Sequence, residues 1–168
     1  MKQNLFFSLL CAAWMSGCQS TTSKADDTAD SDLVATTGSL DIRFAMDPNL
    51  ITSMDEPAAG RFVGDVYNAD EVGALGPEPG AEALETISVD VDLGDGQQET
   101  GILIRTMELD VPFVTVLGYL DSDGNRASTD EMPDAADPVT LPGPNTFEVI
   151  FGQTTAVTVE FGILFPGQ

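Results

Sequence analysis

The chain has 168 residues, with 28 acidic side chains against 6 basic ones, so its net charge is −22 at neutral pH. It contains no histidine, which excludes a Ser-His-Asp triad and the usual zinc sites. A surface this acidic repels nucleic acid and anionic lipid headgroups, so we expect cations, basic proteins or neutral ligands as partners, and no nucleic acid. The alternative is that the charge only keeps the protein soluble.

The N-terminus has the layout of a secretory signal. Lys2 supplies a basic head, residues 5–15 form an apolar run, and the small pair Ser16-Gly17 precedes Cys18. The apolar run is too short to cross a bilayer as a helix, which takes roughly 20 apolar residues. The sequence therefore predicts a signal peptide at residues 1–17.

A cysteine directly after small residues resembles the lipobox of bacterial lipoprotein signals. The resemblance implies that Cys18 is acylated, with palmitate among its acyl chains, and anchors the protein in the cell envelope. Residue 19 is Gln and not Asp, which implies the outer membrane or cell surface if the source is a diderm bacterium. The alternative is a chance cysteine behind an ordinary secretory signal. Because Cys11 lies within the signal, the mature chain would contain neither a disulfide nor a cysteine nucleophile besides Cys18.

Residues 18–37 predict a disordered, acidic tether after the lipid-modified cysteine. Ser, Thr and Asp fill 12 of the 19 positions from Gln19 to Thr37, and such a composition cannot form a core. Residues 38–168 are long enough for one domain with a hydrophobic core, which we expect to be a monomer.

The apolar pattern of that domain has a period of two, which places apolar side chains on one face of a strand. The alternating apolar residues are Leu40, Ile42, Phe44 and Met46; Ile87, Val89, Val91 and Leu93; Phe147, Val149 and Phe151; and Val157, Val159, Phe161, Ile163 and Phe165. Further strands are expected at 61–67, 101–108 and 113–120. Parts of the last two strands are apolar at successive positions, which indicates burial on both faces. The pattern predicts an all-β fold, a single antiparallel β-sandwich of about seven strands.

Turn-forming residues separate these runs. Gly94-Asp95-Gly96 predicts a hairpin, and Gly152-Gln153-Thr154 links the last two strands. One helical turn is expected at Asp47-Pro48-Asn49, with Asp as the cap and Pro at the first helical position. Residues 68–84 and 121–145 predict long loops, which on a rigid scaffold are common binding sites.

Two segments in the last third resemble known extracellular modules. Residues 119–141, from Tyr119-Leu120-Asp121-Ser122-Asp123-Gly124-Asn125 to Asp137-Pro138-Val139-Thr140-Leu141, resemble the acidic loop of B-type repeats in bacterial surface adhesins. Residues 147–159 resemble the final hairpin of transthyretin-like modules, including carboxypeptidase regulatory-like domains, and Gly64-Asp65-Val66-Tyr67 resembles their first strand. The resemblance implies a prealbumin-like or Ig-like sandwich that serves as a binding module or a structural spacer and does not catalyse a reaction. It also implies that the acidic loop holds calcium.

Carboxylates at alternate positions of a flexible loop suit calcium, which takes six to eight oxygen ligands. The loop does not match a helix–loop–helix calcium site in either register, so we expect an adhesin-like site closed by its later acids. The candidate ligands are Asp121, Asp123, Asn125, Asp130, Asp134 and Asp137. The alternative is an acidic, solvated turn that binds nothing.

We expect no enzymatic activity. A glycosidase needs only two carboxylates beside a sugar cleft, so it remains a remote alternative, but no motif singles out such a pair. Two functions are left: a lipid-anchored binding or adhesion module for a protein or glycan, and a structural spacer of the envelope with no ligand. An exposed apolar patch near the long loops would favour binding, and a uniformly polar rim would favour the spacer.

Overall fold

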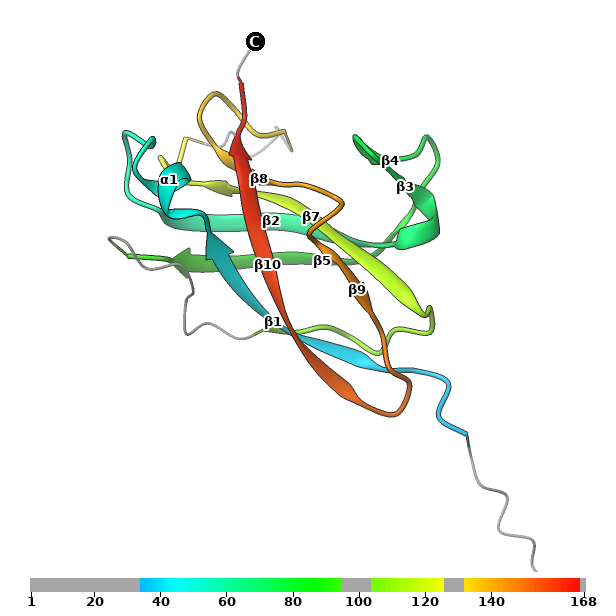
Figure 1. The fold of residues 1–168 in the computed structure, drawn as a ribbon. Coiled ribbons are helices and arrows are strands. Elements are labelled where there is room, and N and C mark those ends of the chain that lie inside the picture. The colour runs from blue at the N-terminus through cyan, green and yellow to red at the C-terminus, as the bar shows by residue number, and fades with distance from the viewer. Residues whose placement is uncertain (1–33, 95–103, 126–131, 167–168) are drawn as a thin grey trace, which may run out of the picture. The chain divides into compact units, whose positions relative to one another are not determined.

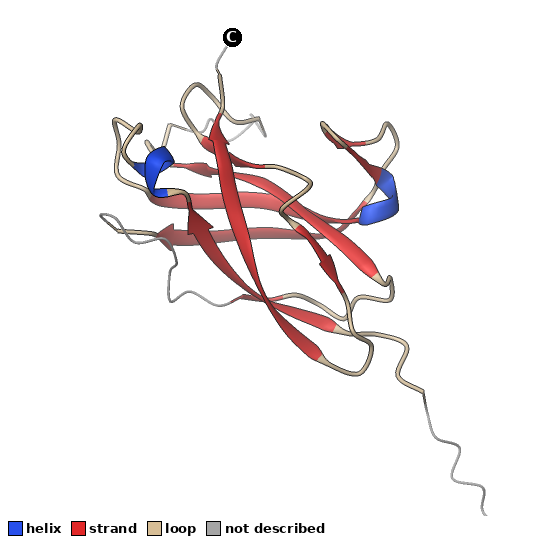
Figure 2. Cartoon of the chain, viewed as in Figure 1, coloured by secondary structure: helices blue, strands red, loops and turns tan. Residues whose placement is uncertain are grey.

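The computed structural model describes residues 34–94, 104–125 and 132–166, all of which belong to one compact unit spanning residues 33–168. These residues are mostly β-strand (Figure 2). The strands are β1 (Ser39–Met46), β2 (Ala59–Asn68), β3 (Val72–Gly73), β4 (Gly76–Pro77), β5 (Ala83–Asp92), β6 (Ile104–Arg105), β7 (Phe113–Asp121), β8 (Pro138–Thr140), β9 (Thr146–Glu148) and β10 (Thr154–Leu164). The helical elements are α1 (Pro48–Ile51) and the 3₁₀ turn η1 (Ala69–Glu71). The mostly-β prediction is confirmed.

Seven strands follow one hydrogen-bonded path in the order β5-β2-β7-β8-β10-β1-β6. Strand β9 pairs with the beginning of β7, and β3 and β4 form a separate small hairpin. The path curls strongly into a half-barrel, so that β1 and β10 cross in front of β2, β5 and β7 (Figure 1). Within the described part of the chain, the strands thus form one curled sheet. It does not divide clearly into the two packed sheets of the predicted β-sandwich.

The expected antiparallel pairing is wrong for one central pair. Strands β1 and β10 run parallel over their shared length, from Ser39 beside Thr154 to Met46 beside Phe161. Parallel neighbours need a long connection, and the whole domain between these two strands supplies it. Alternation of side chains predicts which face of a strand is buried, but it contains no information about strand direction.

The expected hairpin at Gly152 is also not formed. Strand β9 pairs with β7, whereas β10 pairs with β8 and β1, so the turn at Gly152 joins strands that are not neighbours. Strands β5 and β6 lie at opposite ends of the sheet path. The remainder of the expected turn at Gly94-Asp95-Gly96 and the first residues of the 101–108 strand lie outside the described residues.

The core lies inside the curl. The alternating residues of β1, from Leu40 to Met46, are buried as expected. Three aromatic rings from three strands meet at the centre: Phe44 lies 4.6 Å from Phe62 and 6.1 Å from Phe161, measured between ring centroids. Such pairs contribute about 0.5–1.5 kcal/mol each beyond the area they bury, and here they hold β1, β2 and β10 together.

The helical turn forms where the sequence predicts it. Asp47 caps α1, and its Oδ1 accepts a hydrogen bond of 2.7 Å from the backbone N–H of Asn49. Pro48 occupies the first helical position, where its missing N–H costs nothing. None of the helices in the described residues is long and apolar enough to cross a membrane.

Candidate functional site

Two features on the outside of the curl are candidates for function: a cluster of carboxylates at the end of β7, and an apolar groove beside it. Asp121 is the last residue of β7, and Asp137 directly precedes β8. Because these strands are antiparallel with Tyr119 opposite Val139, Asp121 and Asp137 come to stand opposite each other two residues further on. Strand pairing therefore brings together two acids that are 16 positions apart.

Asp123, in the turn after β7, completes the cluster. The ligand oxygens of Asp121, Asp123 and Asp137 all lie within 4.8 Å of one another. Asp121 and Asp137 are buried, with exposed fractions of 8% and 4%, while Asp123 is exposed. Oxygens around a single calcium ion lie at most about 5 Å apart, since each is 2.3–2.6 Å from the ion. The spacing of the three carboxylates thus fits one shared cation.

An unpartnered buried atom distinguishes this cluster from an ordinary acidic turn. Asp121 Oδ1 is buried and has no hydrogen-bond partner among the described residues. A buried carboxylate oxygen without a donor is costly, because it loses hydration and gains nothing in return. A cation between the three carboxylates would remove that cost, so the residues present fit a metal ion.

The pKa of Asp137 reports the same crowding. It is raised to about 6, first because burial penalises the charged carboxylate, and further by the negative charges of Asp134 and Asp121. Backbone N–H groups of Asp134 and Ser122 oppose the rise. The backbone N–H of Asp134 donates to Asp137 Oδ2 over 3.1 Å.

Local hydrogen bonds shape the turn that carries Asp123. Its Oδ1 accepts from the backbone N–H of Asn125 over 3.0 Å, and its Oδ2 accepts from the Asn125 side-chain amide. Gly124 has a φ of 69°, the left-handed conformation that glycine adopts without strain. On the other side, backbone bonds of 2.9 and 2.7 Å tie Ala136 and Asp137 to Phe165 beyond β10.

The predicted ligands thus divide into three groups. Asp121, Asp123 and Asp137 come together. Asn125 and Asp134 lie beside the cluster and form the hydrogen bonds just described, but the Asp134 carboxylate is not part of it. Asp130 and the lipidation candidate Cys18 lie outside the described residues.

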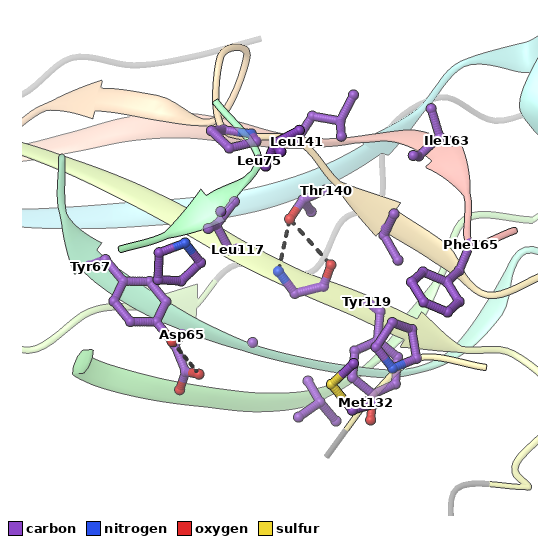
Figure 3. A pocket seen from close by; sticks show the side chains of 18 of the residues that line it. Asp65, Tyr67, Leu75, Leu117, Tyr119, Met132, Thr140, Leu141, Ile163 and Phe165 are labelled. Atoms are coloured by element: carbon purple, nitrogen blue, oxygen red, sulfur yellow. Dashed lines mark hydrogen bonds between the residues drawn. The ribbon is translucent and has the colours of Figure 1, made fainter. Parts of the chain in front are cut away.

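The apolar groove lies on the outer face of β2, β7, β8 and the end of β10, with a volume of about 840 Å³. In Figure 3, Asp65 and Tyr67 lie at one end, Tyr119, Met132 and Phe165 lie at the other, and Leu117 and Thr140 lie between them. Its volume lies in the range of ligand pockets, about 300–1,000 Å³. The residues 68–84 and 121–145, expected to be loops, contribute the turn between β3 and β4, β4 itself and β8 to its walls.

Several groove residues are unusually exposed for their type. Leu75, at the tip of the β3–β4 hairpin, is fully exposed, and Met132 and Ile163 expose 61% and 42% of their surface. The sequence pattern predicts Ile163 on the buried face of its strand. The structure corrects this, because the pairing of β10 with β8 shifts register between Phe161 and Ile163 and turns Ile163 outward.

The polar groups of the groove are held by internal hydrogen bonds. The Asp65 carboxylate accepts from Thr86 Oγ1 over 2.6 Å and from the Tyr67 hydroxyl over 3.2 Å. Burial and the neighbouring Asp65 carboxylate raise the pKa of Tyr67, so it remains a donor. Thr140 Oγ1 accepts from the Gly118 N–H over 2.8 Å. These bonds fix the groove's shape and leave its surface largely apolar.

Comparison of the chain with protein-family models, with curated proteins and with solved structures gave no match. The sequence pattern singles out no individual groove residue, although the two predicted binding loops, residues 68–84 and 121–145, supply part of the lining. Leu75 stands in a stretch rich in Gly and Pro, and Tyr119 belongs to a strand whose pattern indicates burial on both faces.

Proposed function

We propose that this protein is a lipid-anchored binding module of the cell envelope, whose β domain holds a partner in the outer groove and a calcium ion in the acid cluster. The observation that carries the binding function is the groove itself. A spacer without a ligand would present a polar rim, whereas this chain of net charge −22 keeps Leu75, Met132 and Ile163 exposed together. The resemblance to prealbumin-like and Ig-like sandwiches, and to adhesin repeats, is consistent with this scaffold role.

A protein partner fits the groove better than a glycan. Within the described part of the chain, Asp65 is the only charged side chain in the groove lining, and its oxygens already accept two hydrogen bonds. Sugar hydroxyls that lose water need hydrogen-bond partners, and the polar groups Asp65, Tyr67 and Thr140 of this lining already bond within the protein. The same lining argues against a glycosidase, since none of its described residues offers a second carboxylate to face Asp65. The proposed function is therefore non-catalytic.

The calcium part of the proposal rests on Asp121 Oδ1, the buried oxygen without a partner among the described residues. Asp121, Asp123 and Asp137 would hold the ion, and water or backbone oxygens would supply the other ligands that calcium requires. The ion would neutralise part of the repulsion between the carboxylates and hold the turn after β7 against the residues before β8.

Binding is tested with an uncharged probe. A short peptide with a centre of Leu and Phe residues flanked by serines, carrying a neutral fluorophore, is titrated with the full chain, and its fluorescence anisotropy is measured. The double variant Leu75→Ser/Ile163→Thr should weaken binding about tenfold or more, the effect of losing interface anchors of about 1.4 kcal/mol. The control is Phe151→Ser, an aromatic residue 40% exposed outside the groove. If both variants bind like the wild type, or if the peptide does not bind, the groove is not a binding site.

The anchor is tested separately. Cells producing the wild type or Cys18→Ser are labelled with an alkyne fatty acid, and the protein is recovered and scored for label. The wild type should be labelled and partition with membranes, because each buried CH₂ of an acyl chain contributes about 0.8 kcal/mol. Equal labelling of the two proteins would show that Cys18 is not the lipidated residue.

A further inference from the structure

We propose that the partner segment is basic as well as apolar: an extended stretch of a protein in which apolar side chains fill the groove and a Lys or Arg lies on each side of them. This inference rests on the proposed function of the groove and specifies its ligand. It follows from the positions of charged groups around the groove.

The two ends of the groove carry negative charge. At one end lies Asp65, which stands opposite Leu117 in the pairing of β2 with β7. At the other end β7 continues past Tyr119 to Asp121, whose neighbours are Asp123 and Asp137. Leu117, Tyr119 and Asp121 alternate along one strand, so they share its outer face.

The distance between these ends sets the spacing of the partner's charges. Asp121 is four residues beyond Leu117, which at roughly 3.3 Å per residue corresponds to about 13 Å along β7. An extended peptide spans that length with about four residues. A segment with a basic side chain before and after about three largely apolar residues would therefore place each cation near one acidic end.

The surroundings of the groove strengthen this preference. Among the residues that the structure describes, its lining contains no Lys or Arg. The β3–β4 hairpin that carries Leu75 is flanked by Glu71 and Glu78, both exposed. A bound divalent ion would offset only two of the three negative charges of the acid cluster. Arg61 stands opposite Asp121 on β2, but its charge is matched by Asp90, 3.6 Å away. The Asp134 carboxylate beside Asp137 adds a further negative charge, so that end remains negative. Opposite charges at the rim of an interface raise the association rate and select against wrong partners.

The form of the groove points to a protein segment. Leu75 projects from the tip of a hairpin and is fully exposed, so a small molecule lying in the groove would leave much of it in water. A polypeptide that passes between the hairpin and the end of β10 would cover both Leu75 and Ile163. A second copy of this chain is a poor occupant, because two molecules of net charge −22 repel each other.

Three labelled peptides with the same Leu and Phe centre test the proposal: one flanked by lysines, one by serines and one by glutamates. We expect the lysine peptide to bind the full chain about tenfold more tightly than the serine peptide at low salt, with the glutamate peptide weakest. The difference should shrink at about 0.5 M salt, where charges several ångströms apart are screened. Asp65→Asn removes the charge and retains one side-chain oxygen, which can accept from Thr86, so it should reduce the advantage of the lysine peptide over the serine peptide.

The outcomes separate this inference from the function on which it rests. Equal affinity for the lysine and serine peptides overturns the basic preference and leaves the groove as a binding site. Binding of the lysine peptide that survives Leu75→Ser/Ile163→Thr overturns the inference, because the attraction is then a property of the acidic surface alone. A dimer in sedimentation that Leu75→Ser/Ile163→Thr dissociates would assign the groove to a second copy and also overturn the inference.

Discussion

Asp121 and Asp137 face each other across the end of the β7–β8 pair, and one of them retains a buried oxygen with no hydrogen-bond donor among the described residues. Two carboxylates at opposed positions of a sheet repel each other, so the folded domain contains an electrostatic cost that a cation can relieve.

The first prediction is that calcium raises the melting temperature of the wild type and not of Asp121→Asn. Extracellular modules bind calcium with dissociation constants of about 10⁻⁴–10⁻³ M, so about 1 mM calcium adds roughly 0.4–1.4 kcal/mol to the free energy of unfolding. The melting temperature should rise by a few degrees. Magnesium should have less effect, because it requires a tighter octahedral arrangement of ligands.

The measurement is a thermal melt in EDTA, magnesium and calcium at matched ionic strength. In EDTA, Asp121→Asn should melt at the same temperature as the wild type or above it, since one buried charge is gone. Glu148→Gln is the matched control, because it removes an exposed acid from β9, away from the cluster. Calcium should raise its melting temperature as much as that of the wild type. Identical wild-type melts in all three solutions would mean that the cluster is only an acidic turn.

The second prediction concerns the pH dependence of the metal-free protein. The pKa of Asp137 rises from 3.8 to about 6 on folding, so between these values the folded state binds more protons than the unfolded state. The contribution of Asp137 to the free energy of unfolding is therefore complete below pH 3.8 and is lost as the pH rises through about 6. Replacing it with asparagine should remove this loss.

Urea unfolding in EDTA at a series of pH values measures the effect as a difference between wild type and Asp137→Asn. The variant should gain stability relative to the wild type between acid and neutral pH. Taking the difference cancels the other acids, such as Asp41, whose pKa is lowered by its hydrogen bond with Arg105. A difference that does not change with pH would show that Asp137 titrates normally in the folded protein.

The sequence predicts the fold where a strand has one buried face, and it fails where pairing decides the outcome. The alternation in β1 matches burial residue by residue. Strand β8 was not foreseen, because its three residues begin with Pro138 inside a long acidic stretch, and only its position between β7 and β10 makes it a strand. The outward turn of Ile163 depends on a register shift that no local pattern encodes.

The candidate site was predictable in part for the same reason. The close spacing of Asp121 and Asp123 indicates a cation site directly, but the choice of Asp137 over Asp134 follows from the register of β7 against β8. The groove requires the β3–β4 hairpin and the end of β10 to be placed beside β7. Residues that come together only through the tertiary fold have no signature in a single sequence.

The third prediction concerns Asn145, a buried residue in the turn before β9. Its side-chain amide donates to the carbonyl oxygens of Leu141 and Glu160, each over 2.9 Å, and its Oδ1 accepts from the Glu160 N–H over 2.7 Å. Asn145→Ala leaves these three backbone groups without their partner and should cost about 3 kcal/mol or more, at about 1 kcal/mol or more for each.

Chemical denaturation measures this cost. The matched control is Asn49→Ala in α1, where the side chain is exposed and donates only to Asp47. That change should alter the free energy of unfolding by no more than about 0.5 kcal/mol. Equal effects of the two substitutions would contradict a structural role for Asn145.

The fourth prediction concerns Gly118, which pairs with Gly64 where β7 runs antiparallel beside β2 under the groove. A Cβ at Gly118 would lie 2.4 Å from the Val63 carbonyl oxygen and 2.7 Å from the rim of the Phe62 ring. Both contacts are closer than atoms can approach, and one is with backbone. Gly118→Ala must therefore separate the two strands or displace Phe62 from its contacts with Phe44 and Phe161.

Overpacking of this kind costs about 1–3 kcal/mol, so Gly118→Ala should lower the melting temperature by several degrees. Gly143→Ala is the control, since no atom lies within 4 Å of the Cβ it would add. Gly118→Ala should also weaken binding of the serine-flanked peptide. The groove residues Val63, Leu117 and Tyr119 belong to β2 and β7, the two strands that the substitution separates. If Gly118→Ala melts and binds like Gly143→Ala, the close approach of β2 and β7 does not support the groove.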